Sequence, residues 1–277
     1  MRKNNNFIER SIMGALSFLK DSIFAQDYAE QSGFLQSLDP RIKSITFLLF
    51  IIQVLFSRSI PALLFLYSLS LILALTSGIN LGFFLKRTWV FIPLFALFIA
   101  IPALFSKFTP GEPLSTWNIL GIKLIITRQG LGAAFTFIMR VAASVSFAVL
   151  LTITTRHIEL LKTLRIFKIP QVFVMTLGIC YRYIYLFVGI IEDTYRAIKS
   201  RVGTAVHYKS GQNIVAWNIV FLWSRSLKLN EEVYRAMLSR GYTGEARVLN
   251  EFKAGLKDWL WLSASIILIG TATIYFK

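Results

Sequence analysis

Long apolar runs bounded by charged residues follow one another along this chain. A helix needs about 20 mostly apolar residues to cross the hydrocarbon core of a bilayer. Five runs qualify, at residues 39–57, 60–78, 89–106, 130–154 and 259–276. The first opens with Asp39 and Pro40, an acidic N-cap followed by proline in the first helical position. The pattern predicts an all-α integral membrane protein with five transmembrane helices.

The connections between these runs add detail. Only Arg58 and Ser59 separate the first two runs, so a tight turn should join two antiparallel neighbouring helices. The third run contains Pro93 and Pro102, which membrane helices tolerate when neighbouring groups satisfy the freed carbonyls. Kinks are therefore expected in the third helix.

A sixth apolar stretch, residues 171–191, is ambiguous. Arg182 interrupts it, and basic residues flank it on both sides. If it crossed the membrane, the arginines that follow would lie outside, against the charge bias that sets orientation. We therefore place it in or along the cytoplasmic face and keep the N-terminus inside. This topology puts 24 of the 30 lysines and arginines in the cytoplasm and 5 outside, with Arg140 in the membrane.

Composition agrees with lipid as the surrounding solvent. Apolar residues make up 55% of the chain and the mean hydropathy is +0.61, which is too apolar for a soluble domain of 277 residues. The formal net charge of +16 follows mostly from the predicted topology. Nucleic acid is therefore not needed as a partner, whereas membrane lipid is.

Motifs that carry chemistry are scarce. The single Cys180 excludes a disulfide framework within the chain and a site built from several thiolates. His157 and His207 are too few and too far apart for a metal cluster or an acid–base site. No glycine-rich phosphate loop of the Walker type occurs, so the chain is not expected to hydrolyse a nucleotide. We expect a protein that is not an enzyme and has no catalytic residue, cofactor or metal site.

Arg140 leaves two interpretations open, because a charge within a membrane span can serve a relay or a partner, or can pair within the helix bundle. The alternative function is a self-sufficient membrane permease or membrane enzyme with a site inside the helix bundle, using Arg140 and Arg182. That alternative predicts convergent polar residues inside several spans. Apart from Gln53, Arg140 and some serines and threonines, such residues are scarce.

About a hundred residues between the last two spans are too apolar for a soluble domain and too charged for lipid. A short amphipathic helix with Ile158, Leu161 and Leu164 on one face should end at Pro170. Two longer helices should follow, at 171–201 and 212–240. The second should end at Gly241, because glycine accepts the left-handed conformation past a helix C-terminus. The predicted regions are a cytoplasmic tail (1–38), four transmembrane helices (39–155), a cytoplasmic or interfacial helical region (156–258) and a final transmembrane helix (259–277).

The ends of the two longer helices resemble each other. Residues 192–201 align without gaps on residues 231–240, with Glu, Tyr, Arg, Ala, Ser and Arg in register, and each copy closes a helix just before a glycine. Two equivalent ends suggest two equivalent grooves on a dimeric partner or on a pair of homologous subunits. Alternatively, the arginines complement the helix dipole or pair with Glu192 and Glu231. For Arg196 and Arg235 this second interpretation is preferred.

Several motifs together resemble a known family. They are the run from Gly33 through Asp39 and Pro40 to Lys43, the stretch from Leu160 to Pro170, and the sequence Arg235-Ala236-Met237 followed by Ser239-Arg240-Gly241-Tyr242. The chain resembles the transmembrane T component of energy-coupling factor (ECF) importers, in the cobalt and nickel branch called CbiQ or NikQ. The last motif is similar to the second of the family's two Ala-Arg-Gly signatures, and Ser200-Arg201-Val202 falls where the first would be. Both copies carry serine in place of alanine, and the first lacks the glycine.

The resemblance implies a coupling subunit in the prokaryotic inner membrane. Its partners would be two ABC-type ATPase subunits and a small substrate-binding membrane subunit, with cobalt or nickel as the transported ion. In that family, arginine-tipped coupling helices dock into grooves on the ATPases, and the closing of the ATPase pair is transmitted to the substrate subunit. The candidate docking residues are Ala197, Ser200, Arg201, Ala236, Ser239, Arg240 and Gly241.

Overall fold

The computed structural model describes residues 28–31, 33–90, 92–102, 113–119, 122–202, 208–244 and 254–275. These residues fall into two compact units. The bundle unit comprises the described residues from 28 to 160 and from 254 to 275, and the two-helix unit comprises those from 161 to 244. Most of the predicted cytoplasmic tail, residues 1–27, lies outside the described residues.

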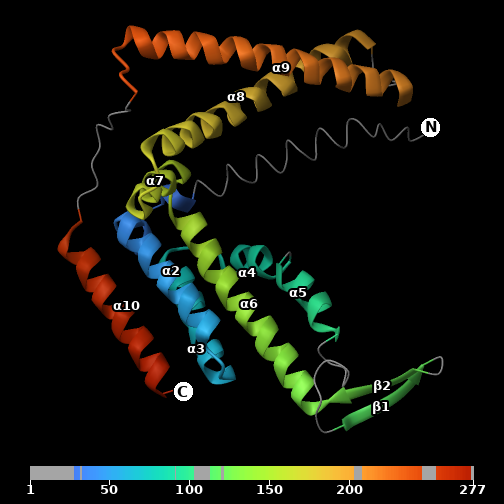
Figure 1. Ribbon diagram of the computed structural model, residues 1–277, viewed down its shortest axis with the longest axis vertical. Coiled ribbons are helices and arrows are strands. Elements are labelled where there is room, and N and C mark those ends of the chain that lie inside the picture. Colours follow the sequence, from blue (N-terminus) through green and yellow to red (C-terminus); the bar gives the residue numbers. More distant parts are fainter. Residues whose placement is uncertain are drawn as a thin grey trace. The chain divides into compact units, whose positions relative to one another are not determined.

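Helices form the frame of the bundle unit (Figure 1). Its elements are η1 (Leu35–Ser37), α2 (Pro40–Phe56), α3 (Ile60–Thr76), α4 (Leu81–Trp89), α5 (Ile92–Ala100), α6 (Arg128–Thr154), the start of α7 (His157–Thr163) and α10 (Leu256–Tyr275). The predicted all-α membrane class is confirmed. Asp39 caps α2 as expected, because its side chain accepts a hydrogen bond from the backbone of Arg41.

Four described helical runs are long and apolar enough to cross a membrane, at Leu81–Ala100, Arg128–Thr154, Gln171–Thr194 and Leu256–Tyr275, and Ile60–Thr76 is a shorter apolar helix. The run 171–191 thus qualifies by length and composition, and its place along the cytoplasmic face stays a prediction. The third expected span, 89–106, begins earlier in the structure. It is divided into α4 and α5, and Pro93 lies in the first turn of α5, where its missing amide hydrogen costs no helical hydrogen bond.

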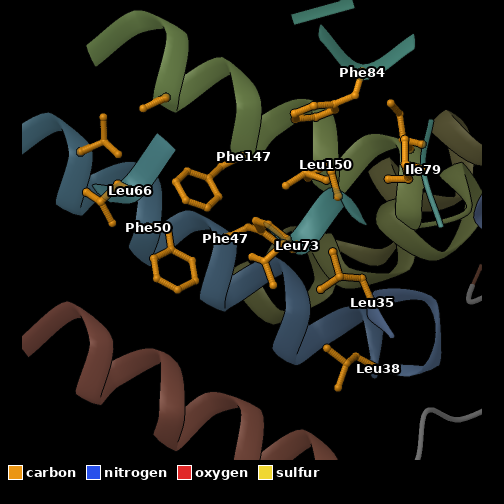
Figure 2. Close-up of a cluster of buried hydrophobic side chains, with 14 of the residues drawn as sticks. Leu35, Leu38, Phe47, Phe50, Leu66, Leu73, Ile79, Phe84, Phe147 and Leu150 are labelled. Carbon is orange, nitrogen blue, oxygen red and sulfur yellow. The ribbon is translucent and has the colours of Figure 1, made fainter. Parts of the chain in front are cut away.

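A core of aromatic and aliphatic side chains holds α2, α3 and α6 together (Figure 2). The rings of Phe50 and Phe147 stack with centroids 5.1 Å apart, and Phe47 lies 6.0 Å from Phe147. Ala142 and Ala143 on α6 are fully buried, and small residues let membrane helices approach closely. α10 packs against α2, where the Trp261 indole donates a hydrogen bond of 3.0 Å to Thr46 Oγ1.

A two-stranded hairpin precedes α6, in the segment that the sequence predicts to be an outside loop. Strands β1 (Pro113–Ile119) and β2 (Ile122–Thr127) pair antiparallel, from Pro113 opposite Thr127 to Ile119 opposite Ile122. The register shifts between Pro113 and Ser115. Thr127 then caps α6 by accepting a hydrogen bond from the Gly130 amide. The hairpin is a small addition to a helical protein and was not predicted.

The two-helix unit consists of η3 (Leu164–Phe167), α8 (Gln171–Val202) and α9 (Tyr208–Ser239). The expected stop before α8 is confirmed, because η3 ends at Phe167, Lys168 follows in the left-handed conformation, and α8 begins after Pro170. Among the described side chains of α8 and α9, Val174 is the only buried one. These two helices therefore keep most of their surface free for lipid or for other proteins.

Candidate docking site

The two long helices carry the candidate docking residues at their C-terminal ends. α8 and α9 contact each other and cross in Figure 1. Residues 203–207 join the end of α8 to the start of α9, so the C-terminal end of α9 lies at the opposite end of the pair from the C-terminal end of α8 (Figure 1). The repeated sequence is thus presented twice, at two separated places.

The end of α9 is a complete capping motif. Arg240 directly follows the last helical residue, and Gly241 has a φ of 80°. The Gly241 amide donates a hydrogen bond of 3.0 Å to the Leu238 carbonyl, and the Tyr242 amide donates one of 3.0 Å to the Met237 carbonyl. This pair of bonds is the Schellman motif, which needs a left-handed residue at the glycine position. The predicted end of this helix at Gly241 is confirmed.

The end of α8 is built differently. The residue that aligns with Gly241 is Val202, and α8 continues through it in helical conformation. A β-branched residue strongly disfavours the left-handed conformation, so the α9 type of cap does not fit at this position. Arg201 consequently lies within the last helical turn, whereas Arg240 lies just past it. Gly203 is outside the described residues.

The serine and alanine of the two copies form the same contact. The Ser200 hydroxyl donates a hydrogen bond of 2.8 Å to the Ala197 carbonyl, and the Ser239 hydroxyl donates one of 3.0 Å to the Ala236 carbonyl. All four residues are exposed. Because each serine turns back onto its own helix, the arginine that follows is the longest polar group at each end. The structure therefore reproduces the sequence repeat in its local contacts.

The arginines divide into two classes. Arg196 contacts Glu192 at 2.5 Å and Arg235 contacts Glu231 at 3.9 Å, both at a spacing of four residues. The preferred interpretation of these two arginines as partners of glutamates on their own helix is confirmed. Arg201 and Arg240 are exposed and have no ion pair within the described part of the chain. These two arginines can therefore reach a partner without giving up such a pair.

Arg140 serves the bundle itself. Its Nη2 donates a hydrogen bond of 2.8 Å to the carbonyl of Ser57, the residue directly after α2. Its buried Nε has no hydrogen-bond partner within the described residues. Of the two interpretations left open by the sequence, the structure supports pairing within the bundle. Arg182 is exposed on α8.

A polar cluster at the start of α2 was not anticipated from the sequence. Lys43 is 1% exposed, and its Nζ donates hydrogen bonds of 2.9 Å to the Leu35 carbonyl and 2.9 Å to the Thr154 carbonyl. Asp258 is 6% exposed, and its Oδ1 accepts a hydrogen bond of 2.8 Å from the Asp39 amide. One available signal was a lysine in the first turn of a helix, where the dipole disfavours a cation.

No cluster of three or more His, Cys, Asp or Glu side chains suited to a metal ion occurs within the described ranges. Burial lowers the pKa of His157 below its usual value of 6.5, and the positive charge of Arg87 lowers it further. The neutral imidazole is therefore favoured at physiological pH. Neither observation indicates a reactive site among the described residues.

Comparison with known proteins adds an independent line of evidence. Residues 31–250 match the family model described as CbiQ, cobalt transport protein. An uncharacterized protein of Methanocaldococcus jannaschii is 36% identical over 98% of this chain and 93% of its own length. The energy-coupling factor transporter transmembrane protein EcfT of Streptococcus thermophilus is 27% identical over 93% of this chain and 99% of its own length. EcfT of Clostridium kluyveri is 26% identical over 91% and 95%. The helical membrane fold and the matches over nearly the whole chain lead to one conclusion: the chain belongs to the CbiQ family of transmembrane T components of energy-coupling factor transporters.

Proposed function

We propose that this T component couples two ABC-type ATPase subunits to a small substrate-binding membrane subunit, and that the assembled importer takes up cobalt or nickel. The observation that carries the proposal is the pair of matching helix ends on α8 and α9, each with an exposed arginine that has no described ion pair. Two matching ends suit two matching grooves, as a pair of homologous ATPase subunits would present. The chain itself supplies coupling and not hydrolysis.

The spacing of the two ends suits two separate partners. α8 and α9 each contain 32 residues. A helix rises 1.5 Å per residue, so each is about 48 Å long. Because α9 starts next to the end of α8, Arg240 lies roughly one helix length from Arg201. That separation is comparable to the width of a protein domain and exceeds what one groove spans.

An arginine suits such docking chemically. Its planar guanidinium can bond a carboxylate or helix-end carbonyls with two parallel hydrogen bonds, whereas lysine keeps the charge but loses the fork. Arginine is also enriched among the few residues that dominate interface energies. The small residues around each arginine would then fit closely against the partner. They are Ala197 and Ser200 beside Arg201, and Ala236, Ser239 and Gly241 beside Arg240.

The apolar surface of α8 and α9 would carry the substrate-binding subunit. Phe173, Trp217 and Trp223 are 64%, 75% and 69% exposed. Large exposed apolar groups mark either a protein interface or lipid contact. Replacing both tryptophans with alanine should release the substrate subunit while the ATPases stay bound. Retention of the substrate subunit by this variant would instead assign the surface to lipid.

Cobalt as the transported ion is supported by the description of the matching family, and nickel is added by the sequence resemblance to the cobalt and nickel branch. We expect the ion to be held by the substrate subunit. Calorimetry should therefore detect no tight cobalt or nickel binding by the purified chain alone, and uptake of radioactive cobalt or nickel should require the complete assembly. Stoichiometric metal binding by this chain alone would favour a permease with its own site.

The proposed setting is the inner membrane of a prokaryotic cell, with residues 156–257 in the cytoplasm and Lys277 outside. In a Cys180→Ser background, a cysteine at the exposed position of Thr243 should be protected from impermeant thiol reagents in intact cells. A cysteine replacing Lys277 is the matched control, and it should be labelled. Labelling of Thr243→Cys from outside would contradict this topology.

The central test is the double variant Arg201→Ala, Arg240→Ala. Losing a desolvated arginine at the centre of a small interface costs about 2 kcal/mol, or roughly thirtyfold in affinity. The double variant should therefore insert normally, lose its ATPases during purification and support no uptake. Arg196→Ala with Arg235→Ala is the matched control and should behave like the wild type. A double variant that retains its ATPases and transports at the normal rate would rule out docking through these ends.

A further inference from the structure

The chain leaves the bundle unit for α8 through the connection between α6 and α7, residues 154–157, which we call the joint. Lys43 binds this joint. α6 ends at Thr154, whose carbonyl is one of the terminal groups that find no partner within a helix. Lys43 Nζ supplies that partner at 2.9 Å and simultaneously binds the Leu35 carbonyl in η1. One ammonium group thus ties together η1, the first turn of α2 and the end of α6. α7 begins three residues later, at His157, and the chain continues to η3 and α8.

The chain returns to the bundle at the same turn of α2. At the start of α10, Asp258 Oδ2 accepts a hydrogen bond of 2.8 Å from the Gly255 amide. Its Oδ1 accepts one of 2.8 Å from the amide of Asp39, the residue that caps α2. The carboxylate therefore fixes the beginning of α10 to the beginning of α2. Both covalent connections between the bundle and the α8–α9 pair are fastened within residues 39–43.

Lys43 violates two local preferences to make this connection. A cation in the first turn of a helix opposes the helix dipole, and a buried ammonium loses its hydration. The negative charges of Glu159 on α7 and of Asp39 act on Lys43 and offset part of this cost. An apolar side chain of similar length would avoid both penalties, so the lysine has to be explained by what it binds. Departures from local rules of this kind concentrate at functional positions.

Within the described residues, an open pocket lies beside the joint. Thr154, Arg156 and Glu159 line a cavity of about 740 Å³ within the bundle unit. Thr155, between α6 and α7, is 2% exposed, and its buried hydroxyl has no partner within the described residues. The joint is therefore incompletely packed on one side, while Lys43 fixes it on the other.

We propose that the first turn of α2 is the anchor through which movement of α8 and α9 reaches the transmembrane bundle, with Lys43 as the principal positioning residue and Asp258 as the second. The inference rests on the proposed function, because it presumes that ATPases move α8 and α9. Lys43 and Asp258 then contribute nothing to docking or hydrolysis. They determine how much of the movement is passed on.

The test uses the complete importer reconstituted in lipid vesicles, with three readouts: ATPase association, ATP hydrolysis and substrate taken up per ATP. Lys43→Met keeps the length of the side chain and removes both hydrogen bonds. It should retain its ATPases and its hydrolysis, while uptake per ATP falls by about tenfold, which lies within the usual range of coupling between distant sites. Asp258→Asn replaces one acceptor oxygen by a donor and should lower uptake per ATP by about threefold.

Two controls separate coupling from general stability. Lys86→Met makes the same change at an exposed lysine of the bundle unit. Trp261→Phe removes a hydrogen bond between the same helices, α10 and α2, but away from the anchor. Both should transport with normal uptake per ATP.

The anchor hypothesis is wrong if Lys43→Met transports as much per ATP as the wild type, if it loses its ATPases, or if Trp261→Phe uncouples transport to the same extent. Should Lys43→Met fail to insert, Asp258→Asn decides the question, and normal coupling in that variant overturns the hypothesis. Failure of the proposed function gives a different result, since the double arginine variant would then bind its ATPases and transport normally.

Discussion

The bundle unit buries apolar side chains against one another, whereas the two-helix unit leaves most of its apolar side chains exposed. In the bundle unit, Phe47, Phe50 and Phe147 are fully buried against one another, as are aliphatic side chains of α2, α3 and α6. In α8 and α9, Val174 is the only buried side chain among those described, and Trp217 is 75% exposed. The bundle unit therefore contains its own core, while the two-helix unit depends on lipid or partners for its apolar surface.

Mutations in the two units should therefore affect different properties of the protein. A substitution in the bundle core removes contacts within the chain and should lower the stability of the isolated protein. A substitution on α8 or α9 removes contacts that only an assembly supplies, and it should lower association while leaving unfolding unchanged.

The largest effect is expected in the bundle core. Phe147→Ala removes a ring that stacks on Phe50 with a centroid distance of 5.1 Å. Such truncations cost about 3–5 kcal/mol of unfolding free energy. Thermal unfolding of the purified chain in detergent should show a strongly lowered midpoint, whereas the matched Trp217→Ala should leave it nearly unchanged. Equal losses in the two variants would remove the contrast between the units.

The next largest effect is expected from replacing one arginine at a helix end. Arg201→Ala and Arg240→Ala should each weaken ATPase association by about 2 kcal/mol, with no shift in thermal unfolding. Arg240→Lys should be nearly as weak as the alanine variant, because the bidentate fork is lost. Titration of the purified chain with labelled ATPase subunits measures both. Full affinity in the lysine variant would show that charge alone carries the contact.

A smaller effect should distinguish the two ends from each other. Gly241 has a φ of 80°, and an L-residue pays about 1–2 kcal/mol in that conformation. Gly241→Ala should therefore loosen the end of α9 and weaken ATPase binding several-fold, with faster amide exchange at Tyr242. Val202→Ala is the matched change on α8, where the backbone is helical, and should be neutral. Equal effects at the two positions would show that the cap does not position Arg240.

The smallest effect concerns pH. The pKa of His157 is lowered in the folded protein, so the unfolded chain binds more protons between the folded value and 6.5. This contribution to stability is fully present above pH 6.5 and is lost as the pH falls through that window. Unfolding midpoints measured from pH 7.5 downward should decline less steeply for His157→Gln than for the wild type. Parallel profiles would show that His157 is not the titrating group.

Local patterns in the sequence predicted much of this structure. The acidic cap before Pro40 and the glycine at 241 act through bonds between residues two to five positions apart, so their roles could be inferred without a fold. The pairing of Arg196 and Arg235 with glutamates four residues earlier belongs to the same class. These features depend on helix geometry alone.

The features that the sequence did not reveal depend on distant partners. Lys43 was read as one of the cytoplasmic charges and as the end of the motif from Gly33, but its role as a buried donor was not predicted, because its partner Thr154 is 111 residues away. Asp39 was recognised as a cap, but its own amide is bound by Asp258, 219 residues away. The start of α4 at Leu81 was also missed, although its signal is local. Asn80 caps this helix by accepting a hydrogen bond of 2.9 Å from the Gly82 amide.

The opposite placement of the ends of α8 and α9 also bears on symmetry and stoichiometry. A pair of homologous ATPases is related by a twofold axis, and for both grooves to be filled that axis must pass near the middle of the α8–α9 pair. In the proposed assembly, a single asymmetric chain would meet a twofold partner with two similar ends, Arg201 in a helical turn and Arg240 beneath a glycine cap. Both grooves would then be occupied at once, so a second copy of this chain would find no free groove. We therefore expect one copy of this chain for every two ATPases.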